Sequence, residues 1–111
     1  MAIQAKEGLY TLQCDEIKLS VQFALGRGEF GRIGSSPEME ISLPLVGLSN
    51  EECRILRDES DFLWLTRTDG QPGVRIDPPC YFSAGPYRFL FREENQIYNG
   101  GSRRRTLGPN N

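Results

Sequence analysis

The side chains available for chemistry in this chain are carboxylates, hydroxyls, guanidiniums and three thiols, because the sequence contains no histidine. Without histidine, the Ser-His-Asp and Cys-His nucleophilic systems, histidine metal sites and histidine pH switches are all excluded. Cys14, Cys53 and Cys80 are odd in number and widely spaced, so they predict neither a metal motif nor a disulfide framework and indicate a reducing compartment. We therefore predict that the chain is not an enzyme and holds no metal and no cofactor.

Two segments have spacings that other proteins use for ligands or helix starts. Residues 26–31 (GRGEFG) fit the GxGxxG pattern of dinucleotide sites, but the residues that follow cannot begin a long helix and no strand-helix-strand unit surrounds them. Residues 49–52 (SNEE) have capping-box spacing, yet the apolar positions after them fit a helix poorly. We predict a turn at the first segment and a turn leading into a strand at the second.

Composition limits the possible partners and location. The 111 residues suffice for one hydrophobic core, and a net charge of -2 with an isoelectric point near 5.2 argues against nucleic acid as the main partner. The N-terminus has no basic-then-apolar leader, and no apolar run reaches about 18 residues, so we predict neither a signal peptide nor direct membrane insertion. The expected location is the cytoplasm, although a domain cut from a larger membrane protein would have the same composition.

These residues must be positioned by short strands, because apolar segments alternate with turn residues along most of the chain. The clearest alternation puts Ile17, Leu19, Val21 and Phe23 on one face, after a hairpin at residues 15–16. The predicted strands are Leu9–Cys14, 17–25, the end of 26–34, 39–43, 53–55, 62–66, Val74–Ile76, 81–82 and 87–91. Such a series, with no long 3.6-residue period, indicates an all-β sandwich.

The alternation also predicts a core and a tail. Placing Leu63 and Leu65 inside the sandwich puts Phe62 and Trp64 on the opposite face, although Trp64 is itself a core candidate by residue type. The predicted core comprises Leu19, Val21, Phe23, Ile33, Ile41, Leu43, Ile55, Leu63, Leu65, Val74, Ile76, Phe89 and Phe91. We assign 1–94 to the sandwich and 95–111 to a flexible basic tail or linker. Its segment 103–106 (RRRT) is a solvated tail, a contact for acidic lipid or nucleic acid, or a kinase-recognition sequence presenting Thr106.

Residues 32–43 (RIGSSPEMEISL) and 46–55 (VGLSNEECRI) resemble the forkhead-associated (FHA) domain family. That family's pattern is Ile-Gly-Arg, a short turn, Asp-Ile-x-Leu, a loop, Val-Ser-Arg-x-His-Ala-x-Ile, a later Asn-Gly-Thr-x-Val and a final Leu-x-x-Gly-Asp. The match extends from about Leu9 to Phe91, and the hydrophobic frame carries it: Ile33, Gly34, Ile41, Leu43, Leu48, Ile55, Leu65, Val74, Ile76, Phe82 and Gly85. The resemblance implies an FHA/SMAD-like β-sandwich of about ten to eleven short strands that binds phosphothreonine peptides through loops at one end.

The resemblance locates the peptide-binding loops, but most of the binding residues differ. Ser35 stands where the family has its phosphate-binding arginine, and Glu52 where it has a loop-bracing histidine. The family's serine is kept as Ser49. The arginine after that serine is Asn50, and the asparagine that holds the peptide backbone is Pro72, which has no backbone N–H. The candidate peptide-binding positions are therefore Ser35, Ser36, Ser49, Asn50, Glu52, Pro72 and Gly73.

Charge around this expected pocket opposes phosphate. A phosphothreonine carries about -1.5 to -2 charges and is bound best by the fork of an arginine. The acids near the pocket are Glu38, Glu40, Glu51 and Glu52. The arginines that could substitute from neighbouring strands are Arg27, Arg32, Arg54 and Arg75.

We predict a non-catalytic protein-protein interaction or scaffold module in which phosphothreonine recognition is lost. The resemblance also implies a setting, because similar degenerate FHA domains lie on the cytoplasmic side of bacterial secretion-system membrane rings and contact neighbouring subunits without phosphate. The alternative is a functional phosphothreonine-peptide reader with a non-standard pocket, such as one that captures phosphorylated Thr106. Replacing Ser49 with alanine separates the two hypotheses, because only the reader needs that hydroxyl.

Overall fold

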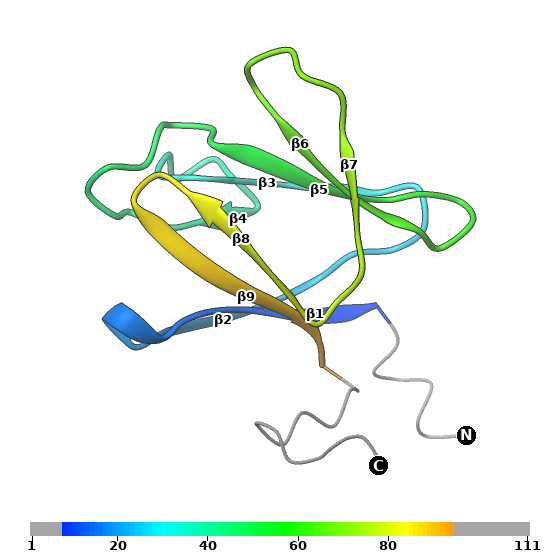
Figure 1. The fold of residues 1–111 in the computed structure, drawn as a ribbon, viewed down its shortest axis with the longest axis horizontal. Helices are drawn as coiled ribbons and strands as arrows, with labels where there is room; N and C mark the ends of the chain where they lie inside the picture. The colour runs from blue at the N-terminus through cyan, green and yellow to red at the C-terminus, as the bar shows by residue number, and fades with distance from the viewer. Residues whose placement is uncertain (1–7, 95–111) are drawn as a thin grey trace.

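Residues 8–94 form two β-sheets that face each other in the computed structural model (Figure 1). The four-stranded sheet has the strand order β2-β1-β9-β8, and the five-stranded sheet has the order β4-β3-β5-β6-β7. This arrangement confirms the predicted all-β sandwich. The described residues contain nine strands, as many as the segments expected from the alternation, whereas the family resemblance implied about ten to eleven. The predicted tail, 95–111, lies outside the described residues.

Hydrogen-bonded pairing defines both sheets. The four-stranded sheet contains β1 (Leu9–Cys14), β2 (Leu19–Ala24), β8 (Cys80–Ala84) and β9 (Tyr87–Glu93). The five-stranded sheet contains β3 (Phe30–Gly34), β4 (Ile41–Ser42), β5 (Cys53–Arg57), β6 (Leu63–Arg67) and β7 (Val74–Ile76). All neighbours pair antiparallel except β3 and β4, which run parallel. The predicted bounds of β1 and β7 are confirmed.

The connection between β1 and β2 differs from the predicted hairpin. Asp15–Ile17 form a 3-10 helix, η2, and Lys18 ends it in the left-handed region at φ 54°. Strand β2 therefore begins at Leu19, which pairs with Cys14, and not at Ile17. Ile17 leaves the predicted inward face and is 40% exposed.

The core lies between the two sheets. Of the predicted core residues, Ile33, Ile41, Leu43, Ile55, Leu63, Leu65, Phe89 and Phe91 are buried, and Leu19, Val21, Phe23 and Ile76 are partly buried against them. The prediction for Val74 is wrong, because this residue is 62% exposed on the three-residue edge strand β7. Further buried apolar residues that the predicted core omitted are Tyr10, Leu12, Cys14, Leu25, Leu48, Cys53, Phe82, Ala84 and Leu90.

Three polar contacts involve the end of β5 and the turn that follows it. Trp64 is half-buried on the face opposite Leu63 and Leu65, and its indole N–H donates to Asp58 Oδ2 at 2.9 Å. Arg57, which the sequence places in a polar connecting run, is instead the buried last residue of β5. Its Nη1 donates to the Leu25 carbonyl oxygen at 2.8 Å, and its Nη2 lies 2.7 Å from Asp61 Oδ1.

Candidate functional site

Strand register gathers three loops at one end of the five-stranded sheet. Ile33 near the end of β3 pairs with Cys53 at the start of β5, and Cys53 pairs with Arg67 at the end of β6. The β3–β4 turn (35–40), the β4–β5 loop (43–52) and the β6–β7 loop (68–73) therefore leave the sheet on the same side. We call this side the loop end. It contains all seven predicted peptide-binding positions.

Backbone hydrogen bonds join the β3–β4 turn to the β4–β5 loop. The Ser35 N–H donates to the Ser49 carbonyl oxygen at 2.9 Å, and the Ser36 N–H donates to that of Asn50 at 3.2 Å. Gly34 permits this approach, because a Cβ at that position would overlap the Asn50 carbonyl oxygen. Four of the predicted positions are thus held side by side.

The Ser35 hydroxyl and the Glu52 carboxylate bind the loops themselves. The Ser35 hydroxyl donates to the Ser49 carbonyl oxygen at 3.2 Å, and the Ser49 N–H donates to Glu52 Oε1 at 3.0 Å. The Glu52 N–H donates to the Ile33 carbonyl oxygen at 2.7 Å. The capping-box spacing of residues 49–52 therefore serves a turn leading into β5, as predicted, and not a helix start.

Pro72 and Gly73 lie apart from this cluster, on the β6–β7 loop. No hydrogen bond or ion pair in residues 8–94 joins either residue to the other two loops. A Cβ at Gly73 would come within 2.9 Å of Thr66 Cγ2, so this glycine packs against its own hairpin. The structure brings together five of the seven predicted positions and leaves these two at the next hairpin.

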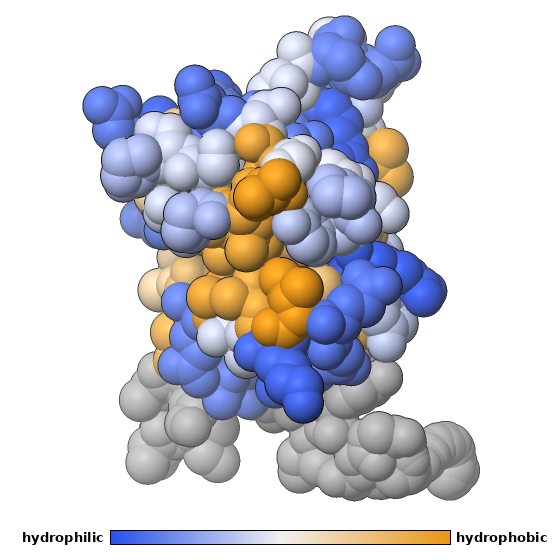
Figure 2. Space-filling view, turned by 90° about the vertical axis from the view of Figure 1, so that its left-hand side faces the viewer, coloured by the Kyte–Doolittle hydropathy of each residue, from blue (hydrophilic) through white to orange (hydrophobic). Residues whose placement is uncertain are grey.

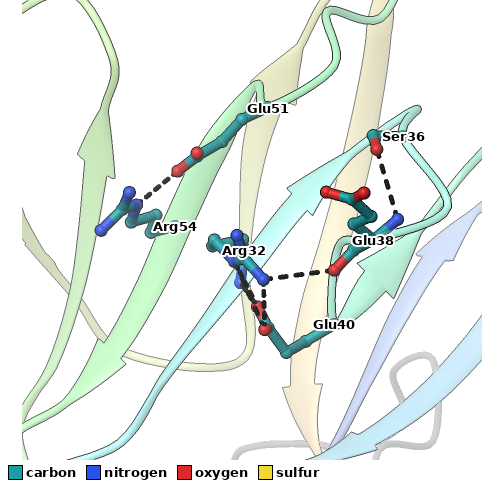
Figure 3. A network of polar contacts seen from close by, with 6 residues as sticks. All are labelled: Arg32, Ser36, Glu38, Glu40, Glu51 and Arg54. Carbon is teal, nitrogen blue, oxygen red and sulfur yellow. Dashed lines mark hydrogen bonds and ion pairs between the residues drawn. The ribbon is translucent and has the colours of Figure 1, made fainter.

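Arg32 of β3 and Arg54 of β5 are paired with carboxylates (Figure 3). Arg32 Nη2 lies 2.8 Å from Glu40 Oε2 and donates to the Glu38 carbonyl oxygen at 3.2 Å. This guanidinium and the Arg32 N–H hold the pKa of Glu40 at about 2, so the pair stays ionised. Arg54 forms a short ion pair with Glu51.

The other two candidate substitutes for the missing arginine are also engaged. Arg27 Nη2 lies 2.8 Å from Asp61 Oδ2, at the end of the sheet opposite the loop end. Arg75 sits over the Phe62 ring, with its Cζ 3.8 Å from the ring centroid. All four arginines that the sequence offered therefore have partners.

Arg67 is a loop-end cation that the sequence analysis missed. It shares the inward side of β6 with Leu63 and Leu65, lies opposite Cys53 and is half-buried. Within residues 8–94 no hydrogen bond or ion pair engages its guanidinium. Burial raises the pKa of the Cys53 thiol to about 12, although the charge of Arg67 acts in the opposite direction. The signal that could have found Arg67 is its two-residue spacing from Leu65.

An apolar surface borders the same loops. Figure 2 shows hydrophobic side chains in a band on the face where the β1–β2 connection and the β4–β5 loop lie in Figure 1. Val46 of the β4–β5 loop is 89% exposed, and its carbonyl oxygen accepts the Tyr87 hydroxyl at 2.7 Å. Gly47 packs on Pro86 of the β8–β9 turn. Val46 is therefore held outward by a braced loop.

Among residues 8–94 there is no group of three acidic or cysteine side chains that could hold a metal ion. No helix in the described part of the chain is long and apolar enough to cross a membrane. Within residues 8–94 the site consists of two arginine-carboxylate pairs, serines of which Ser35 binds the neighbouring loop, the unpaired Arg67 guanidinium and apolar residues.

Comparisons with known proteins identify the fold. No family model matches the chain, and no curated protein matches its sequence. Among solved structures, the FHA domain of CT664 from Chlamydia trachomatis matches with TM-score 0.64 and 14% identity over 76% of this chain and 96% of that one. An FHA domain studied for phosphothreonine-dependent interactions matches with TM-score 0.61 and 18% identity over 79% of this chain and 99% of that one.

A third structure covers more of the chain than these two. The cytoplasmic domain of the T3SS sorting platform protein PscD from P. aeruginosa matches with TM-score 0.63 and 14% identity over 88% of this chain and 91% of that one. The chain thus has the FHA fold, which its sequence resemblance implied.

Proposed function

We propose that this FHA-fold domain is a non-catalytic protein-interaction module whose partner is recognised without phosphate. The observation that carries the proposal is the pairing of two loop-end arginines, Arg32 and Arg54, with carboxylates. Arg32 of β3 and Arg54 of β5 are already neutralised by Glu40 and Glu51. No described cation stands at Ser35 itself, where the FHA pattern has its phosphate-binding arginine.

Electrostatics supports this proposal. A phosphate that approached Arg32 would compete with Glu40, which stays ionised because its pKa is about 2. It would also meet Glu38 and Glu52, and like charges at short range disfavour its dianionic form. Each charged hydrogen bond that the phosphate failed to gain would forfeit about 1.5–3 kcal/mol of binding.

Apolar contacts provide a different basis for recognition. Val46 is displayed on a loop braced by Tyr87 and Pro86, so a partner would not have to order it. Ile17, in the connection between β1 and β2, is 40% exposed. A surface of this kind suits contact with another protein subunit.

The wider setting is proposed by analogy. The PscD cytoplasmic domain belongs to a protein of a secretion-system sorting platform. We place the present domain, residues 1–94, on the cytoplasmic side of a comparable protein assembly. Residues 95–111 would then serve as a basic linker, and fractionation of cells producing the natural protein would test this location.

Titration against peptides tests phosphate independence directly. A degenerate phosphothreonine peptide library and its unphosphorylated counterpart are titrated against the full chain at low and physiological salt. We expect no difference between the two libraries beyond a weak repulsion of the phosphorylated one. Phosphate-dependent binding with a micromolar Kd would refute the proposal.

Arg67 favours a second candidate function, a phosphothreonine reader with a rebuilt pocket. Its guanidinium is unpartnered among the described residues and lies one strand from Cys53, where the β4–β5 loop ends. If this candidate holds, Arg67→Met and Ser49→Ala each abolish phosphopeptide binding, including binding of a peptide phosphorylated at Thr106. Retained binding in both variants would exclude it.

A further inference from the structure

The four edge strands of the sandwich are not equally protected. β4 has two residues, β7 has three, and β8 follows Pro78 and Pro79. β2 has six residues (LSVQFA), with no proline and no charge, and it pairs only with β1. Long uncharged edges offer free backbone N–H and C=O groups to another strand. β2 is therefore the edge of the described fold best suited to accept one.

A groove of about 650 Å³ adjoins β2. It separates the C-terminal half of β2 from β3 and β4 of the other sheet, and Phe23, Leu25, Phe30 and Ile41 give it apolar walls. Phe30 is 47% exposed there. A strand added beside β2 would project alternate side chains into this groove, since Val21 and Phe23 face the same way.

The groove is acidic at the turn that follows β2. The Glu29 carboxylate accepts the Gly26 N–H at 2.7 Å, and the Glu59 carboxylate lies directly over Gly28. Neither acid forms an ion pair within residues 8–94. Residues 8–94 contain nine lysines and arginines and fourteen acidic residues, so their net charge is -5.

The negative charge of the described domain indicates which kind of chain could occupy the groove. Two copies joined through β2 would bring together two domains of like charge, each -5 over residues 8–94, and β2 itself has no basic residue to face Glu29 or Glu59. A basic segment would instead neutralise both acids. Charge complementarity therefore favours a basic partner over self-pairing.

We propose that β2 and its groove bind an extended segment of a partner protein, about six residues long, with apolar residues at alternate positions and lysine or arginine beside them. The segment adds to the four-stranded sheet as a fifth strand, placing its apolar side chains on Phe23 and Phe30 and its basic residues at Glu29 and Glu59. This inference rests on the proposed function of a protein-interaction module and assigns its binding surface.

Designed peptides provide the test, with the full chain as receptor. The probe is fluorescein-labelled RRVTVTVRR, whose paired arginines suit either strand direction. RRVTPTVRR keeps the charge but cannot complete the strand, and EEVTVTVEE keeps the strand but reverses the charge. We expect the two control peptides to bind about tenfold more weakly or worse, and amide chemical shifts to move mainly in residues 19–25 and 28–31.

Protein variants complete the test. Glu29→Lys with Glu59→Lys is expected to weaken probe binding at least about tenfold, whereas Asp69→Lys with Asp77→Lys, of equal charge change, leaves it within about twofold. Equal binding of RRVTVTVRR and RRVTPTVRR, or shifts centred on residues 35–52, would overturn the proposal. Thermal unfolding of each variant verifies that it is folded.

Two competing occupants are also tested. Replacing Arg103, Arg104 and Arg105 with alanine would raise probe affinity if the chain's own tail held the groove, and that result would overturn assignment to a partner. If analytical ultracentrifugation shows a dimer that RRVTVTVRR dissociates, the groove is occupied by a second copy of the chain, and assignment to a partner protein would likewise be overturned. Phosphate-dependent peptide binding that Arg67→Met abolishes would refute the proposed function. Binding of RRVTVTVRR at β2 would be unaffected by that result, so failure of the proposed function and failure of the β2 proposal are distinguishable.

Discussion

Arg57 and Arg67 occupy matching positions at opposite ends of the inner face of the five-stranded sheet. Each is the last residue of its strand and follows the inward alternation. Arg57 is buried, donates to the Leu25 carbonyl oxygen and pairs with Asp61. Arg67 is half-buried, and no hydrogen bond or ion pair among residues 8–94 reaches it.

The supply of nearby carboxylates explains the contrast. At the Arg57 end, the turn after β5 folds back and brings Asp61 to the guanidinium. At the loop end, Glu40 and Glu51 are taken by Arg32 and Arg54. At one end of the sandwich a buried arginine is paired with a carboxylate, and at the other end Arg67 has no hydrogen-bond or ion-pair partner within residues 8–94.

Replacing each arginine with methionine tests this contrast most strongly. Arg57→Met removes charged hydrogen bonds and leaves the Leu25 carbonyl oxygen unpaired, so we expect a loss of about 2–3 kcal/mol in the free energy of unfolding. The value stays moderate because the Asp61 side chain is 40% exposed. Arg67→Met should change stability by less than about 0.5 kcal/mol. Urea denaturation measures both, and equal losses would contradict the contrast.

A glycine substitution tests how tightly the loop end is built. Gly34→Ala would drive a Cβ into the Asn50 carbonyl oxygen, so we expect a cost of about 1–3 kcal/mol from backbone displacement. Gly31→Ala, on the same strand, meets only side-chain methyl groups, Ile41 Cδ1 at 3.3 Å and Leu25 Cδ1 at 3.8 Å, and serves as the control. Hydrogen exchange should quicken at the Ser35 and Ser36 amides in Gly34→Ala alone. Identical exchange in the two variants would show that the approach at Gly34 is not required.

The Arg32–Glu40 pair predicts a small pH effect. The folded pKa of Glu40, about 2, lies below its ordinary value of 4.5, so its stabilisation is present above about pH 4.5 and is lost as the pH falls toward 2. Glu40→Gln should remove this contribution, which is below about 1 kcal/mol because the pair is exposed. Urea midpoints at pH 7 and pH 3 measure it, with Glu38→Gln as the control. A Glu40→Gln midpoint that still falls like that of the native chain would argue against the pair.

The fold was largely predictable because alternation and turn residues mark its strands. β1 and β7 have their predicted bounds, and most predicted core residues are buried. The prediction that Val74 is buried was wrong because alternation does not reveal whether a strand lies at the edge of a sheet. Tyr10 and Leu12 were missed because alternation identifies a strand without telling which of its faces lies inside when both carry apolar residues.

The position of the candidate site was predictable from the sequence, but the ion-pair partners of its arginines were not. The resemblance located Ser35 and Ser49, and their loops meet as expected. Ion pairing depends on register between strands, so the sequence could not show that Glu40 occupies Arg32. Arg67 belongs to no motif and becomes visible only when β6 is placed beside β5.

Two buried thiols make the local opening of each sheet measurable. Cys14 in β1 and Cys53 in β5 are both 0% exposed, one in each sheet. Alkylation requires an accessible thiolate, so a reagent reaches each cysteine only when its sheet opens. With the half-exposed Cys80 changed to serine, the two alkylation rates would time the opening of each sheet separately. A partner strand bound at β2 would then slow the reaction of Cys14 more than that of Cys53.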